Sequence, residues 1–363
     1  MQRNQINRSL LYQTINIMKR FLTLLIISCQ AAVVLAQDNG QTPYLTKSLA
    51  GADINSVVVS TSAGGIVVKG DDGGSPRVEV YIHGNNGKGD LPKEEIQKRL
   101  DESYDLSVTV NGHEVTAIAK RKHDGDNMDW QKGLSIGFKI YVPVHVSTNL
   151  RTSGGGIILD NLSGSEEFTT SGGGLVVTKL SGKVHGHTSG GGIQISDCSD
   201  DIDMVTSGGG IQAKDCSGNI NLQTSGGGLQ LKNLKGNIKA HTSGGGIIGK
   251  NIEGELIAGT SGGGIDMKEM NCSLEANTSA GSMDIEVVHA GKFLKLNTSA
   301  GNLNLHLPAS QGYDLNLTAE RINDQVASNF HGTWEKNSVN GSVNGGGIPV
   351  QASASSHINI NFN

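Results

Sequence analysis

Two cysteines have a spacing that suggests chemistry. Cys198 and Cys216 stand 18 residues apart. If that spacing stacks them on neighbouring strands, their Cα atoms are expected about 4.8 Å apart, which is within disulfide range. Leucine, isoleucine, methionine and valine hold the same place in other repeats, so small buried hydrophobic residues are the first interpretation and a disulfide is the alternative. Cys272 falls at a different place in its repeat, and no Cys-x-x-Cys motif or matching histidine spacing predicts zinc.

Four lysines recur with the same spacing, namely Lys214, Lys232, Lys250 and Lys268. Stacked on an outward face, they would place one ammonium group on each successive strand. Such a column could bind an anionic polymer, for example an acidic glycan or a lipopolysaccharide. A solvated charged face that opposes aggregation is the simpler interpretation.

Carboxylates and histidines form a third group of candidates. Paired carboxylates can act as general acid and base or bind calcium, but the repeats keep a constant length and leave no long loops to build a cleft. His185 and His187, with His241 further along, lack an evident third metal ligand. No nucleophile elbow, phosphate loop or metalloprotease motif occurs, so we expect no catalytic residue, no metal and no cofactor. The aspartates considered are Asp197, Asp200, Asp201, Asp203 and Asp215.

A tandem repeat must position all of these residues. The motif Thr-Ser-Gly-Gly-Gly recurs every 18 residues, and Thr-Ser-Ala-Gly follows at Thr278. The next copy, Thr298, comes after 20 residues, so we expect two extra residues around His289–Lys292. Thr61 begins an outlying copy near the N-terminus. The regular copies begin at Thr152, Thr170, Thr188, Thr206, Thr224, Thr242 and Thr260.

Within each repeat, apolar residues alternate with polar ones. If each Thr is position 0, positions 5, 10 and 14 are mostly aliphatic, from Ile157 at position 5 to Val288 at position 10 of the last repeat. Positions 6, 8, 15 and 17 are mostly polar. This alternation predicts half-buried strands, and glycines at positions 2–4 and near 12 predict corners. The threonines are expected to point inward, with hydroxyl facing hydroxyl from coil to coil.

Two short strands per repeat cannot bury their apolar face alone, so successive coils must stack. The sequence therefore predicts an all-β fold, a β-solenoid with 18-residue coils over 150–305 and one short inserted helix. A left-handed hexapeptide helix would need apolar residues every six positions, but positions 11 and 17 are usually polar, as at Lys235 and Gln223. A calcium-binding nonapeptide roll would need aspartate where Ile193 and Ile220 stand.

The flanking segments are less regular. Residues 43–150 are predicted to form irregular coils of the same solenoid with a helix over 91–104, and a separate small domain is the alternative. The distance from Thr61 to Thr152 is close to five coils. The regular repeats span 151–310, and 311–363 are predicted to form C-terminal coils and a cap, with Val339–Gly345 and His357–Phe362 in a last coil.

The N-terminus has the three parts of a secretory signal peptide over 1–36. Lys19 and Arg20 precede an apolar run, with cleavage expected after Ala36 and the true start at Met18. Acylation at Cys29 is the alternative. The run is about 15 residues, short of the roughly 20 that span a bilayer, so no membrane span is expected. The net charge of −5 argues against nucleic-acid binding.

These residues resemble a known family. The Thr-Ser-Gly-Gly-Gly-Ile copies, the strand Tyr141–Val144, the closing segment Val343–Gly347 and Ile358–Ile360 are similar to the putative-adhesin β-strand-repeat family, a bacterial domain of unknown function. The resemblance covers roughly residues 45–363. It implies a right-handed, single-stranded β-helix in envelope or secreted proteins, and it brings no catalytic residues.

The favoured function is a non-enzymatic, exported adhesin or cell-envelope scaffold. Its partner would be a cell-surface glycan or an envelope protein, in the periplasm, on the outer surface or outside the cell. A polysaccharide-acting β-helix enzyme is one alternative. The other is a periplasmic partner of a membrane signalling system, bound through the end coils or the 91–104 helix.

Overall fold

The computed structural model describes residues 42–85, 91–122, 133–323 and 329–363. The predicted signal peptide and Cys29 lie outside the described residues. Pro43–Asn363 form one compact unit. It is an all-β solenoid of about nine turns, with about 18 residues per turn and one short helix, so the predicted fold class is confirmed.

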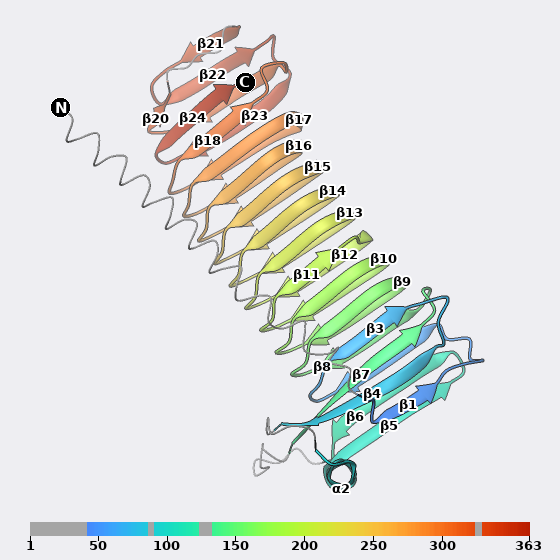
Figure 1. The fold of residues 1–363 in the computed structure, drawn as a ribbon. Helices are drawn as coiled ribbons and strands as arrows, with labels where there is room; N and C mark the ends of the chain where they lie inside the picture. The colour runs from blue at the N-terminus through green and yellow to red at the C-terminus, as the bar shows by residue number, and fades with distance from the viewer. Residues whose placement is uncertain (1–41, 86–90, 123–132, 324–328) are drawn as a thin grey trace, which may run out of the picture. The chain divides into compact units, whose positions relative to one another are not determined.

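The regular part of the solenoid is built from long, bent strands that run through two sides of each coil (Figure 1). The strands are β8 (Ser147–Thr152), β9 (Ile157–Thr170), β10 (Leu175–Thr188), β11 (Ile193–Ser196), β12 (Ser199–Thr206), β13 (Ile211–Thr224), β14 (Leu229–Thr242), β15 (Ile247–Thr260), β16 (Ile265–Thr278), β17 (Met283–Thr298) and β18 (Leu303–Leu307).

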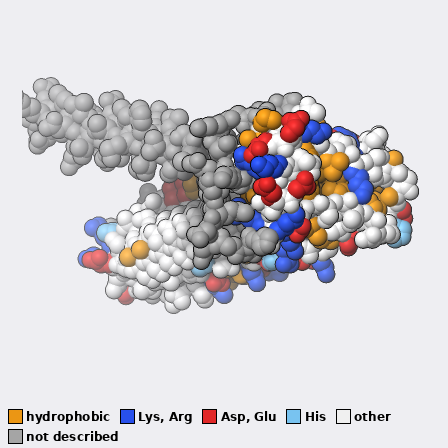
Figure 2. Space-filling model, turned by 90° about the horizontal axis from the view of Figure 1, so that it is seen from below, with side chains coloured by type: hydrophobic (Ala, Val, Ile, Leu, Met, Phe, Trp, Pro, Cys, Tyr) orange, Lys and Arg blue, Asp and Glu red, His pale blue; other side chains and the backbone are white. Residues whose placement is uncertain are grey.

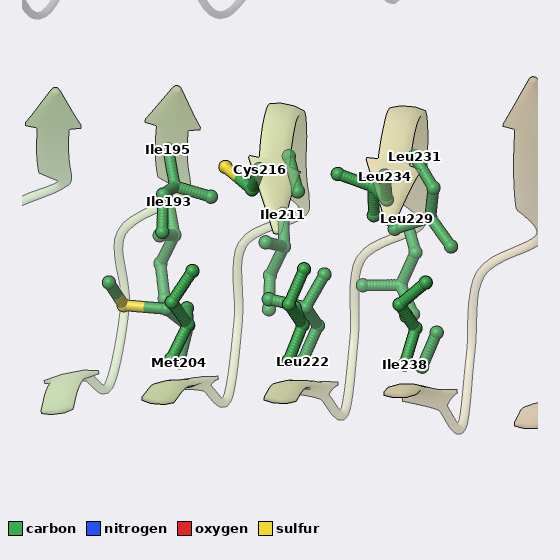
Figure 3. Packing of buried hydrophobic residues seen from close by; sticks show 14 of the residues in the cluster. Ile193, Ile195, Met204, Ile211, Cys216, Leu222, Leu229, Leu231, Leu234 and Ile238 are labelled. Atoms are coloured by element: carbon green, nitrogen blue, oxygen red, sulfur yellow. The ribbon is translucent and has the colours of Figure 1, made fainter. Parts of the chain in front are cut away.

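Residues 18 apart pair directly, which confirms the predicted stacking. Ile193 is paired with Ile211, and Ile211 with Leu229, in parallel register. The side chains at positions 5, 7, 10, 14 and 16 point into the space between the sheets, where they form columns of buried residues. Figure 3 shows Ile193, Ile211 and Leu229 facing inward from successive coils.

The threonine at each coil start is buried, but its bonding differs from our expectation. Thr170 Oγ1 donates to the carbonyl oxygen of Gly155 in the preceding coil at 2.7 Å, and it accepts from the Gly173 N–H at 3.3 Å. The expected hydroxyl-to-hydroxyl ladder is therefore wrong. The hydroxyl proton satisfies a backbone carbonyl and a hydroxyl lone pair satisfies a backbone N–H, so the threonine side chain serves two backbone groups of the corner.

Three features make the corners. The middle glycine of each triplet lies against the coil before it, so that a Cβ on Gly173 would stand 2.1 Å from the Gly155 oxygen. At position 12, Gly182, Gly218, Gly236 and Gly254 have positive φ angles, with 100° at Gly182. Position 9 also has positive φ, near 55°, and the sequence reasoning missed this corner. Its occupants are Asn161, Lys179, Asp197, Asp215, Asn233, Asn251 and Glu269.

The 20-residue coil departs from the register that the sequence suggested. Met270 pairs with Val287, whereas Val288 is 57% exposed, so the assignment of Val288 to the buried column is wrong. Register shifts on both sides of Met270 turn Val288 outward. A further shift between Cys272 and Leu274 contains the two extra residues, within the predicted segment.

At the N-terminal end, the chain doubles back. β2 (Ser56–Thr61) lies between β6 (Glu114–Arg121) and β8, and β3 (Ile66–Gly70) lies between β7 (Leu134–Val142) and β9. Thr61 therefore stacks on Thr152, and the five-coil separation inferred from the sequence is wrong. The residues between β3 and β8 form the outer coil, with the antiparallel strands β4 (Arg77–Gly84) and β5 (Tyr104–Asn111). The strand β1 (Leu45–Ser48), which precedes β2, pairs antiparallel with β4.

The helix α2 (Lys93–Ser103) packs against β4 and β5 through Ile96 and Leu100. Pro92 precedes its first turn, where a missing N–H costs nothing, and Glu94 and Glu95 lie near its positive end. The predicted helix is confirmed, and it is shorter by two residues at its start and one at its end.

The C-terminal end is arranged in the same way. β23 (Ile348–Ala354) lies between β17 and β19 (Tyr313–Thr318), and β24 (His357–Phe362) lies between β18 and β20 (Arg321–Ile322). β22 (Ser338–Val343) pairs antiparallel with β19 and with β21 (Phe330–Trp334). Val339–Gly345 is thus outside the last coil, contrary to our expectation.

Candidate functional site

The lysine column exists as predicted, but it is not a purely cationic surface. Lys214, Lys232, Lys250 and Lys268 are paired strand by strand. Lys214 Nζ lies 3.0 Å from Asp215 Oδ2, and Lys250 Nζ lies 2.9 Å from Glu269 Oε1. Lys268 Nζ lies 3.8 Å from Asp266 Oδ1. These exposed pairs contribute little to stability, but they reduce the positive potential of the column.

The aspartates near positions 12 to 15 of the coil do not converge on one point. The Asp201 carboxylate accepts a hydrogen bond from Asn219 Nδ2 at 2.9 Å. One Asp203 oxygen accepts from Asn221 Nδ2 at 2.7 Å, and the other lies 2.9 Å from His185 Nδ1. Each contact runs from one coil to the next. Across the described ranges, no group of three or more His, Cys, Asp and Glu side chains is placed to hold a metal ion.

Asparagines extend these contacts into ladders along the stack. Asn251 Nδ2 donates to Asn233 Oδ1 at 3.0 Å, and Asn233 Nδ2 donates to Asp215 Oδ1 at 2.6 Å. Hydrogen bonds from Asn233 and Lys214 lower the pKa of the Asp215 carboxyl. The ladder stands at position 9, where asparagine and aspartate tolerate the left-handed backbone. The outer side chains are therefore held in a fixed, repeating arrangement.

The three cysteines in the described part of the chain, Cys198, Cys216 and Cys272, are free and buried. The Cys198 and Cys216 thiols are linked by a hydrogen bond that, together with burial, raises the pKa of Cys198. Backbone carbonyl oxygens are also within reach of the thiol protons: the Cys198 sulfur lies 3.1 Å from the Ser196 oxygen and the Cys216 sulfur lies 3.2 Å from the Lys214 oxygen. Burial raises the pKa of Cys272 to about 12. The disulfide alternative stays a prediction.

One buried acid escaped the sequence reasoning. Glu166 occupies position 14, a column that holds Val184 and aliphatic residues in the later coils, and it is only 1% exposed. Thr148 Oγ1 donates to Glu166 Oε2 at 2.5 Å, while Oε1 has no hydrogen-bond partner among the described residues. Burial raises its pKa to about 7. Because Glu166 is enclosed, it is a core residue and not a site for substrate. The sequence feature that could have revealed it is a charged residue in an otherwise aliphatic column.

The end of the unit that carries α2 is the most charged surface in view. Figure 2 shows Lys and Arg side chains interspersed there with Asp and Glu. Among the described residues, no helix combines the length and apolar composition needed to cross a membrane.

Comparisons with known proteins add little. No protein-family model matches the chain, and no curated protein matches it. One matching solved structure is a putative cell adhesion protein from Clostridium sporogenes, with 12% identity over 88% of this chain and 98% of that chain, at a TM-score of 0.19. Another is a putative adhesin from Bacteroides fragilis, with 13% identity over 87% and 96% of the two chains, at a TM-score of 0.24. Scores this low support no argument about this chain.

Proposed function

We propose that this chain is a non-enzymatic, exported β-solenoid that acts as an adhesin or as a scaffold of the cell envelope. Its partner, a surface glycan or an envelope protein, would contact the long lateral faces. The observation that carries this proposal is the coil-to-coil bonding of outward side chains, such as Asn251 to Asn233 to Asp215. An array that is already ordered loses less conformational entropy when a large or repeating partner binds.

The geometry favours binding over catalysis. General acid–base chemistry needs two titratable groups directed at one reacting bond. Asp201 and Asp203 instead each accept a hydrogen bond from an asparagine in the adjacent coil, so the two carboxylates are oriented along the stack and not toward a common point. Glu166, with its raised pKa, is enclosed in the core. A role in polysaccharide cleavage therefore has less support than a role in binding.

Deletion and complementation test the proposal. Cells that lack the chain are expected to lose adhesion or envelope integrity, and the wild-type gene should restore it. In parallel, the purified chain is incubated with envelope polysaccharides and new reducing ends are measured. Release of reducing ends by the chain would favour the enzymatic alternative and contradict a purely binding role.

A further inference from the structure

At the C-terminal end, the outer surface of one sheet is assembled from segments that are distant in sequence. β16 pairs with β17, β17 with β23, and β23 with β19, all in parallel. Exposed side chains on these four strands are therefore aligned from strand to strand, as they are in the regular coils. Glu275, Lys295 and Gln351 belong to one row, and Asn316 continues it.

A groove of about 530 Å³ lies on this surface, and an adjoining groove of about 430 Å³ shares two of its lining residues, Asn316 and Gln351. The larger groove, called here the C-terminal groove, is lined mainly by amides and hydroxyls. Those used below are Asn277, Asn297, Asn316, Thr318, Gln351 and Ser353.

Most of these polar groups are unpaired. Asn277 Nδ2 donates to Glu275 at 3.3 Å. The side chains of Asn297, Asn316 and Gln351 are exposed and make no hydrogen bond to any described residue. Each amide offers two donor hydrogens and an acceptor oxygen. The C-terminal groove thus presents donors and acceptors side by side, which is the pattern that a sugar hydroxyl needs because it both donates and accepts.

The backbone beneath the groove fixes where these groups stand. Asn297, Asn316 and Gln351 alternate with the buried residues Leu296, Leu315 and Ala352. Rows on neighbouring strands are therefore held about 4.8 Å apart. This order reduces the entropy lost when a ligand binds.

The same arrangement argues against two other kinds of ligand. β23 is paired on both sides, so its backbone groups are used and an extended peptide cannot be added as a further strand. Glu275 and Lys295 are cross-strand partners of opposite charge, so the groove has no single sign to attract a polyanion.

We propose that the C-terminal groove binds a neutral oligosaccharide through Asn297, Asn316 and Gln351. This deepens the proposed function and rests on it, because it gives the adhesin a ligand class and a place. The ligand would lie across β17, β23 and β19, with its hydroxyls bonded to the amides.

The test uses the purified chain on an array of neutral and acidic glycans. The variant Asn316→Ala/Gln351→Ala removes two amides from the groove. The matched control, Gln223→Ala/Gln230→Ala, removes two exposed amides from β13 and β14. Both variants are checked for unchanged thermal unfolding. We expect the groove variant to lose about tenfold or more of its affinity for the neutral glycans that the wild type binds, and the control to keep it.

Two results would overturn the inference: wild-type chain that binds only acidic glycans or none, or equal losses in the two variants. Neither result would touch the broader function, because the deletion phenotype described above does not depend on the ligand class. A groove variant that fails to restore adhesion or envelope integrity to the deleted cells would connect the two.

Discussion

Thr61 pairs in parallel register with Thr152, although the two lie in segments 91 residues apart. The same offset brings Asn161 Nδ2 within 2.9 Å of the Gly70 carbonyl oxygen. The first coil of the compact unit, formed by β2 and β3, is therefore inside the stack. It is covered on one side by β8 and β9 of the regular coils and on the other by β6 and β7, which belong to the excursion between them. β23 and β24 repeat this arrangement at the other end.

Hydrogen exchange should reveal this closure. Amides of β2 and β23 are expected to be protected nearly as well as those of the central strand β13, because each strand is paired on both sides. The outer strands β5 and β21 should exchange first, since each pairs on one side among the described strands. The measurement is native-state exchange followed by mass spectrometry. Fast exchange in β2 with slow exchange in β5 would contradict the strand order.

Glu166 should make stability depend on pH. Its pKa is about 7 in the folded chain against 4.5 as a free side chain, so the folded state holds the proton more tightly. The stabilisation is fully present below pH 4.5 and is lost as the pH rises through about 7, by about 3 kcal/mol if the whole shift is realised.

The variant Glu166→Gln keeps an acceptor for Thr148 but cannot ionise. We expect the wild type to lose more stability than this variant between pH 5 and pH 8 in urea unfolding. Because other groups titrate equally in both proteins, the difference between the two curves isolates Glu166. Parallel curves would show that Glu166 is solvated rather than buried.

The glycine triplets allow a test with adjacent residues. In Gly173→Ala, the new Cβ would stand 2.1 Å from the Gly155 oxygen, the same oxygen that accepts from Thr170. In Gly172→Ala, the nearest atom is 3.5 Å away. We expect Gly173→Ala to cost about 2 kcal/mol or more of unfolding free energy and Gly172→Ala to cost less than about 1 kcal/mol. Equal costs would mean that the coils are not stacked as closely as described.

The lysine column predicts a salt-sensitive contact with polyanions. Changing Lys214, Lys232, Lys250 and Lys268 to glutamine leaves the neighbouring carboxylates uncompensated, so any binding to acidic glycans should weaken, most clearly at low salt. Lys235→Gln is the control, because Lys235 is 73% exposed and lies outside the column. Unchanged binding in the fourfold variant would discard the polyanion hypothesis.

The central coils could be predicted because the same type of residue recurs at the same position of each 18-residue repeat. Ile193 and Ile211 had to be neighbours once the 18-residue repeat was read as a stack. The ends could not be predicted in this way. The contact between Thr61 and Thr152 depends on where an irregular segment folds back, and no repeat encodes that.

The candidate sites divide in the same manner. The lysine column could be predicted from the 18-residue repeat alone. Its ion pairs could not, because Asp215 and Glu269 stand at the position 9 corner. The pattern of polar residues does not reveal the left-handed backbone of that corner. The C-terminal groove combines residues from four strands, and Asn316 and Gln351 share no motif that would associate them.

The central claim is that the chain is exported and works through an exposed lateral face. The most direct measurement is labelling of intact cells with a membrane-impermeant amine reagent, followed by mass spectrometry of the chain. Lys214 and Lys250 have 58% and 53% of their side-chain surface exposed. We predict that both are labelled before the cells are opened. Labelling only after the envelope is disrupted would contradict a surface role.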